Sequence, residues 1–122
     1  MKRILVAEDN RLILETLAHS LSREGYDIIK ATDGKECMAK LEGNQVDLII
    51  TDLYMPNLNG LELISQLNDN SKNLIPIMVL SAAGAEENVI KAFEIGADDF
   101  MVKPFSLIEL NMRVRKLLEL KK

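Results

Sequence analysis

Five short apolar runs alternate with five amphipathic stretches, and this alternation is the feature that most constrains the fold of the chain. Most of the runs are rich in β-branched residues or bounded by turn formers, so we interpret them as strands, most of them buried on both faces. Strands that alternate with helices favour a parallel sheet covered on both faces and joined by right-handed crossovers. The predicted strands cover residues 4–7, 28–29, 48–50, 77–80 and 100–102.

Between the runs, apolar residues recur at spacings of three and four, which is typical of amphipathic helices. Leu14, Leu17 and Leu21 follow this spacing, and Gly25 suits the C-terminal cap of the helix they predict. The other helices are indicated by Met38 and Leu41 before Gly43, by Leu63, Ile64 and Leu67, by Val89, Ile90 and Phe93 before Gly96, and by Leu107, Leu110, Val114, Leu117 and Leu118 after the candidate N-cap Ser106.

Length and composition narrow the class of protein. The 122 residues, 48% of them hydrophobic, suffice for one domain with a real core. A net charge of -4 argues against direct nucleic-acid binding, which favours a basic patch. The single cysteine, Cys37, excludes an internal disulfide, and neither a signal peptide nor an apolar run long enough to span a membrane is present. We therefore expect one domain over residues 1–122, located in the cytoplasm.

The polar residues of greatest interest fall at the ends of the predicted strands. Glu8 and Asp9 follow the first strand, Asp52 follows the third, Ser81 ends the fourth and Lys103 follows the fifth. In open α/β sheets, ligands bind outside the carboxyl ends of the strands. Any one of these residues alone is compatible with a solvated loop or, for Glu8 and Asp9, with helix capping. Their joint placement indicates a single site.

The charges of this cluster indicate its chemistry. Two like charges 4 Å apart repel by about 4 kcal/mol at an effective dielectric constant near 20, so three carboxylates need a counter-charge. Mg²⁺ suits a site with few carboxylates, several waters and a phosphate. Lys103 favours an anionic ligand, and the hydroxyl of Ser81 can donate to a phosphoryl oxygen. This arrangement sets up Asp52 for nucleophilic attack on phosphorus, which gives an aspartyl phosphate.

The same residues resemble the CheY-like receiver domains of two-component response regulators. The resemblance extends from about residue 3 to residue 120, and it implies a doubly wound five-stranded parallel sheet of order 2-1-3-4-5 with five helices. Glu8 stands where Asp is commoner in the family, and Ser81 where Thr is commoner. The motifs are Glu8-Asp9, Asp52-Leu53-Tyr54-Met55-Pro56 with Gly60, Ser81-Ala82, Gly96-Ala97-Asp98-Asp99-Phe100 and Lys103-Pro104-Phe105.

The resemblance also implies residue roles. Asp52 would be the phosphoacceptor, supplied by a sensor histidine kinase or phosphotransfer protein. Asp9 would bind Mg²⁺ directly, Glu8 mostly through water, and Tyr54 through its backbone carbonyl. Lys103, preceding a cis proline, would pair with the phosphoryl group. Such a domain is a signalling receiver that catalyses only its own phosphorylation and slow dephosphorylation, with no output module in residues 1–122.

A second implied feature is a switch. Ser81 would move toward the phosphate and Phe100 would move inward. Plain core packing of Phe100 is the rival interpretation, because the last strand needs an aromatic residue in any case. The surface built by the last two helices and the last strand also resembles the dimer face of OmpR-like regulators, with a phosphorylation-dependent homodimer as the expected result. A solvated charged surface is the alternative. The residues of this face are Lys91, Asp98, Asp99, Glu109, Arg113 and Arg115.

Two other functions can be weighed against the receiver. A pseudo-receiver, which binds partners without taking phosphate, usually lacks one of the acids or the lysine, and none is lacking here. A phosphatase of the haloacid dehalogenase type needs a second Asp two residues after the nucleophile, and Tyr54 occupies that place.

Overall fold

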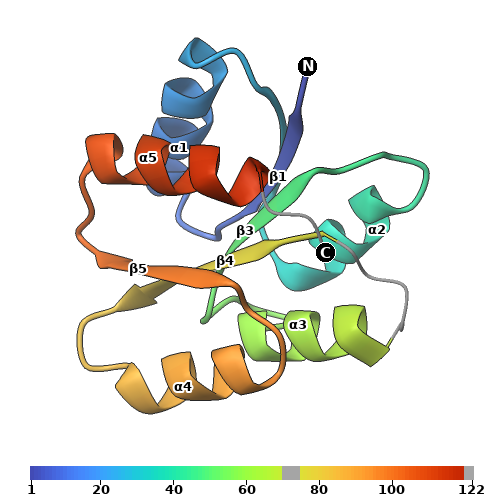
Figure 1. The fold of residues 1–122 in the computed structure, drawn as a ribbon. Helices are drawn as coiled ribbons and strands as arrows, with labels where there is room; N and C mark the ends of the chain where they lie inside the picture. Colours follow the sequence, from blue (N-terminus) through green and yellow to red (C-terminus); the bar gives the residue numbers. More distant parts are fainter. Residues whose placement is uncertain (70–74, 120–122) are drawn as a thin grey trace.

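The computed structural model describes residues 1–69 and 75–119. Its centre is a five-stranded parallel sheet of order β2-β1-β3-β4-β5 (Figure 1), which confirms the predicted fold class. The predicted runs are all strands, and each extends beyond its run by one to two residues at one end or both. The strands are β1 (Arg3–Ala7), β2 (Asp27–Ala31), β3 (Leu48–Asp52), β4 (Ile77–Ala82) and β5 (Asp99–Lys103).

Helices cover both faces of the sheet, and the apolar spacing explains which side each helix buries. Figure 1 shows α1 and α5 on one face and α2, α3 and α4 on the other. The helices are α1 (Arg11–Arg23), α2 (Gly34–Leu41), α3 (Gly60–Asp69), α4 (Glu86–Glu94) and α5 (Leu107–Leu118).

The core therefore consists of two layers, one on each face of the sheet. Successive side chains of a strand point to opposite faces. In β1, Ile4 and Val6 pack with α1 and α5, whereas Leu5 and Ala7 pack with the helices of the other face. The central strands β1, β3 and β4 are almost wholly buried, and β2 and β5 are half exposed because they are the sheet edges.

Local signals fix where helices begin and end. The Asn10 side chain accepts a hydrogen bond from the Ile13 N–H at 3.1 Å and caps α1, and Ser106 caps α5 as predicted. Gly25 has a φ of 97°, a left-handed conformation that glycine adopts without strain, and it follows the last turn of α1. Among the described helices, none is long and apolar enough to cross a membrane.

Candidate functional site

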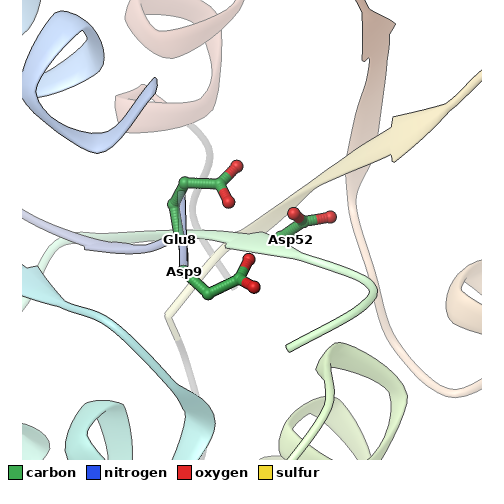
Figure 2. Close-up of side chains that lie close together, drawn as sticks. All are labelled: Glu8, Asp9 and Asp52. Atoms are coloured by element: carbon green, nitrogen blue, oxygen red, sulfur yellow. The ribbon is translucent and has the colours of Figure 1, made fainter. Parts of the chain in front are cut away.

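Three carboxylates gather at the carboxyl edge of the sheet. Glu8 and Asp9 directly follow β1, and Asp52 is the last residue of β3. One oxygen from each lies within 4.8 Å of the others. Figure 2 shows the three side chains projecting from the ends of β1 and β3. Glu8 is fully buried and Asp52 is 6% exposed, whereas Asp9 lies open to solvent.

Lys103 brings a positive charge into this cluster. It ends β5, two strands away from β3, and its peptide bond to Pro104 is cis, as the resemblance implies. Lys103 Nζ lies 2.7 Å from Asp52 Oδ2 and 2.6 Å from Glu8 Oε1. The sequence predicted that Lys103 meets an anionic ligand. In the structure it bridges two of the protein's own carboxylates, so it offsets part of their repulsion itself.

Burial and hydrogen bonding have opposite effects on the pKa values of this cluster. Burial raises the pKa of Glu8 to about 7, and the charge of Asp52 adds to this rise. Hydrogen bonds from Lys103 and from the Asn10 N–H, 3.0 Å from Glu8 Oε2, oppose it. Burial alone would lower the pKa of Lys103, but its hydrogen bonds to Asp52 and Glu8 outweigh burial and raise it. Lys103 is therefore held as a cation between these acids.

Ser81 supplies a hydroxyl beside the acids. It is the last residue but one of β4, and it is 1% exposed. Within the described part of the chain, its Oγ has no hydrogen-bond partner. A buried hydroxyl without a partner is costly, so this atom is suited to a ligand that can accept a hydrogen bond.

Phe100 and Ser81 both line a groove of about 400 Å³ between β4, β5 and α4. Its ring is half buried and meets the Phe93 ring edge to face, with centroids 5.7 Å apart. This contact agrees with a packing role, and the groove leaves space beside the ring. Movement of Phe100 in a switch stays a prediction.

Tyr54 connects the site to α4. Its backbone N–H is 3.5 Å from Asp52 Oδ1, while the hydroxyl of its half-exposed side chain accepts a hydrogen bond from Asn88 Nδ2 in the first turn of α4. No sequence pattern points to Asn88. A lone polar residue on an exposed helix carries no motif, and only the fold brings positions 54 and 88 together.

The six residues of the predicted dimer face lie on α4, on β5 with the residue before it, and on α5. Within one chain, Arg113 already binds Asp99 at 2.8 Å and Glu109 at 3.1 Å, and Arg115 lies 3.7 Å from Glu24. Asp98 accepts a hydrogen bond from the Ile77 N–H at 2.8 Å. Pairing of these residues between two chains stays a prediction.

The donor set fits a hard divalent cation. Carboxylate oxygens are the ligands that Mg²⁺ prefers. Glu8 Oε1 accepts a hydrogen bond from Lys103 and Glu8 Oε2 accepts one from the Asn10 N–H. Asp9 is exposed, and among the described residues Asp52 Oδ1 has only the long contact to the Tyr54 N–H. Asp9 and Asp52 are thus better placed than Glu8 to bind a cation directly.

Comparison with known proteins agrees with this geometry. The sequence profile described as "Response regulator receiver domain" matches residues 4–115. The chain belongs to the response regulator receiver family. The receiver is 43% identical over 117 residues to the alkaline phosphatase synthesis transcriptional regulatory protein PhoP of Bacillus subtilis, covering 96% of this chain and 48% of that protein. It is 41% identical over 115 residues to response regulator RR06 of Streptococcus pneumoniae, covering 94% and 52%.

Solved receivers share the fold. The receiver domain of Francisella response regulator 1452 superposes with a TM-score of 0.90 at 35% identity, covering 98% of each chain. The receiver domain of NtrX from Brucella abortus gives 0.90 at 29% identity, covering 95% of this receiver and 98% of that one. The receiver spans about half the length of the curated relatives it matches. It is a receiver domain of the two-component response regulator type, a class of signalling proteins.

Proposed function

We propose that Asp52 is the phosphoacceptor of this receiver, taking a phosphoryl group from the phosphohistidine of a sensor histidine kinase or phosphotransfer protein. The observation that carries the proposal is the position of the Asp52 carboxylate. It lies 2.7 Å from Lys103 Nζ, in one acidic cluster with Glu8 and Asp9, at the strand edge where the Ser81 hydroxyl has no hydrogen-bond partner among the described residues. The family of the chain supports the same reaction.

The chain's own residues account for each part of the transfer. An ionised oxygen of Asp52 attacks phosphorus, and the phosphorus–nitrogen bond breaks with its electron pair going to the imidazole, which then takes a proton from solvent. The Lys103 ammonium can follow the new charge from the carboxylate onto the phosphoryl oxygens. Ser81 Oγ can donate its hydrogen to one of them, which removes the cost of its burial without a partner.

Mg²⁺ is the cofactor that the donor set favours. Asp9, Asp52 and the backbone carbonyl of Tyr54 would hold it, with Glu8 acting through a bound water. When bound, the ion supplies positive charge that neutralises the phosphoryl oxygens in the transition state.

The proposed output is a change of the surface formed by α4, β5 and α5. A phosphoryl group adds negative charge and acceptor oxygens at the end of β3, and it draws Ser81 and Lys103 toward itself. Both residues lie on the two strands next to α4 and α5, so their displacement biases that surface toward a partner, a second receiver or an output domain. We retain the single domain over residues 1–122 and the cytoplasmic location as predictions.

The receiver returns to its starting state by hydrolysis. A water oxygen attacks phosphorus, the bond from phosphorus to the Asp52 oxygen breaks, and the carboxylate leaves with the electron pair. The products are inorganic phosphate and free Asp52. In this proposal the protein catalyses only its own phosphorylation and its own slow dephosphorylation.

Intact-mass measurement tests the proposal. We expect the protein to gain the mass of one phosphoryl group when it is incubated with Mg²⁺ and acetyl phosphate, and the Asp52→Asn variant to gain none. Chelation of Mg²⁺ should abolish the gain in the wild type. A wild type that gains no mass with acetyl phosphate or with a phosphorylated kinase would favour the pseudo-receiver.

A further inference from the structure

The loop between β3 and α3, residues 53–59, contains a strained turn at Asn57. Asn57 has a φ of 70°, and it is the one non-glycine residue with a positive φ in the described part of the chain. The Leu58 N–H donates to the Pro56 carbonyl at 2.8 Å, which closes a γ-turn around Asn57. A γ-turn with a positive φ is rare and costs backbone energy, so other contacts must stabilise it.

A single carboxylate joins Asn57 to the start of α2. Asn57 Nδ2 donates to Asp33 Oδ2 at 2.8 Å. The other oxygen of the same group, Asp33 Oδ1, accepts a hydrogen bond from the Glu36 N–H at 2.7 Å and caps α2. The hydrogen bonds from Glu36 and Asn57 lower the pKa of Asp33 below its usual range, so the acceptor is ionised at neutral pH. The tip of the loop is thus tied to the helix cap.

The backbones of these two segments also lie in close contact. A Cβ atom on Gly34, the first residue of α2, would lie 2.1 Å from the Leu58 carbonyl oxygen. The Leu58 side chain is 8% exposed and belongs to the core layer of α2, α3 and α4. At the base of the loop, the Gly60 N–H donates to the Leu53 carbonyl at 2.8 Å. The loop is therefore anchored on both sides of Tyr54 along the chain.

We propose that Asp33 and Asn57 are positioning residues that hold this loop in the conformation that binds the cation of the phosphorylation site. The inference rests on the proposed function, in which the backbone carbonyl of Tyr54 is a ligand of Mg²⁺. The direction of a backbone carbonyl is set by the φ and ψ angles of the loop, and Mg²⁺ demands near-ideal octahedral geometry. When the loop samples other conformations, the competent fraction falls and the apparent Kd for Mg²⁺ rises.

Exchanging the two side chains breaks and then restores the link. Asn57→Asp keeps a residue type that tolerates a positive φ, but it replaces the donor with a second carboxylate that faces Asp33. Adding Asp33→Asn reverses the polarity of the contact. The amide oxygen at position 33 then keeps the helix cap, and its NH₂ group donates to the new carboxylate at position 57.

The matched control is Asn44→Asp. Asn44 Nδ2 donates to the Lys40 carbonyl at 2.8 Å, near the other end of α2. This variant makes the same chemical change as Asn57→Asp and also removes a hydrogen bond to α2, but it leaves the β3–α3 loop untouched.

Isothermal titration of the unphosphorylated proteins with MgCl₂ measures the Kd. One hydrogen bond shifts a two-state population by about two- to tenfold, so we expect Asn57→Asp to raise the Kd by up to that factor. The double variant should return close to the wild-type Kd, and Asn44→Asp should match the wild type. An added carboxylate by itself attracts a cation, so charge alone predicts the opposite change. Unchanged or tighter binding in Asn57→Asp, or no recovery in the double variant, would overturn the proposal.

Hydrogen exchange in EDTA gives a second readout that needs no metal. We expect peptides that contain the Leu58 and Gly60 amides to exchange faster in Asn57→Asp than in the wild type, and at the wild-type rate in the double variant and in Asn44→Asp. Equal exchange in all four proteins would mean that Asp33 does not hold the loop. A wild type that binds no Mg²⁺ would overturn the proposed cofactor as well, whereas equal Mg²⁺ affinity in the wild type and Asn57→Asp would overturn only this inference.

Discussion

Lys103 carries one positive charge and is shared by two acids, and this sharing sets the energetics of the site. Glu8, Asp9 and Asp52 together carry three negative charges when ionised, so the cluster remains acidic after Lys103 is counted. The sequence predicted that a metal ion supplies the counter-charge of the acids and that Lys103 meets an anionic ligand. The structure adds that the lysine provides part of it before any phosphoryl group arrives.

Opposite changes of charge at the site should therefore have opposite effects on stability. Without divalent cations, we expect Asp52→Asn to raise the free energy of unfolding by on the order of 1 kcal/mol, because it removes repulsion and leaves Lys103 paired with Glu8. Lys103→Met should lower it by about 1–3 kcal/mol, because the buried Glu8 loses its partner. Thermal unfolding in EDTA measures both. A lower melting temperature for Asp52→Asn would count against a mutually repelling cluster.

Asp52→Asn should also remove the response to magnesium. The wild type should melt at higher temperature as MgCl₂ is added, since an ion that binds only the folded state stabilises it. The variant should respond much less. An equal response in both proteins would place the ion away from Asp52.

Cys37 offers a test of the core layer between the sheet and helices α2, α3 and α4. It is fully buried in α2, and burial raises the pKa of its thiol to about 12. At pH 8 only about one thiol in ten thousand is then ionised, and the thiolate is the reactive form. We expect almost no reaction with Ellman's reagent in the folded protein and rapid reaction in guanidinium chloride. Stoichiometric labelling of the folded protein within minutes would show that α2 does not cover Cys37.

At the scale of elements, the close approach of α3 to the end of β3 positions Asp52. A Cβ atom on Gly60 would lie 2.3 Å from the Asp52 carbonyl oxygen and 2.8 Å from Leu53 Cα. Both neighbours are backbone atoms, which cannot move aside as a flexible side chain can. The Gly60 N–H also donates to the Leu53 carbonyl at 2.8 Å, so the start of α3 and the phosphorylation site are one unit.

Gly60→Ala should consequently impair both stability and phosphorylation. We expect a loss of about 1–3 kcal/mol from overpacking and a slower mass gain with acetyl phosphate. Gly25→Ala is the control. An added Cβ at Gly25 would meet no atom within 4 Å beyond the neighbouring residues, so the substitution costs only about 1 kcal/mol of backbone strain at a φ of 97°, far from the site. Gly25→Ala should keep the wild-type rate. The same loss of rate in both variants would show that the effect is one of stability alone.

The elements themselves were predictable because two periodicities determine them. The five runs became strands and the five amphipathic stretches became helices, since each pattern leaves one arrangement that buries its apolar side chains. The edge strands β2 and β5 are less buried than β1, β3 and β4, and apolar runs alone do not reveal position in a sheet. The placement of Glu8, Asp9, Asp52, Ser81 and Lys103 at one edge followed from the strand ends.

Contacts between distant segments were not predictable. The bridge from Lys103 to Glu8 joins positions 95 residues apart, and the Tyr54–Asn88 hydrogen bond depends on how α4 packs. No local pattern reports either contact. The resemblance supplied a role for Lys103, but the identity of its partners in the unmodified protein required the structure.

At the scale of the whole molecule, the proposed function is a two-state switch that links the strand edge to the surface of α4, β5 and α5. A shift from 1:99 to 99:1 requires about 5.5 kcal/mol of differential stabilisation. Charge-assisted hydrogen bonds of the phosphoryl group with Lys103 and Ser81 can contribute part of this. The apolar groove beside Phe100 lies between the two regions, so it is where a change at Ser81 can be transmitted.

The homodimer belongs to this scale. Self-complementary charges are what a two-fold interface requires. We expect the phosphorylated protein to double its mass in size-exclusion chromatography with light scattering. In the predicted dimer Lys91 would pair with Glu109 of the second copy, so Lys91→Glu and Glu109→Lys should each weaken the dimer, and the combined variant should restore it. Arg113 already forms an ion pair with Asp99 within the chain, so reversing the charge of Arg113 should weaken the dimer less. An unchanged mass on phosphorylation would leave the charged face as a solvated surface.

The central claim is that Asp52 alone carries the phosphoryl group. Borohydride reduces an aspartyl phosphate to homoserine, so reduction after treatment with acetyl phosphate and Mg²⁺, followed by peptide mass mapping, locates the modified residue. We predict homoserine at position 52, dependent on Mg²⁺ and absent when the metal is chelated. Homoserine at position 9, or no homoserine in a protein that has gained the phosphoryl mass, would contradict the account.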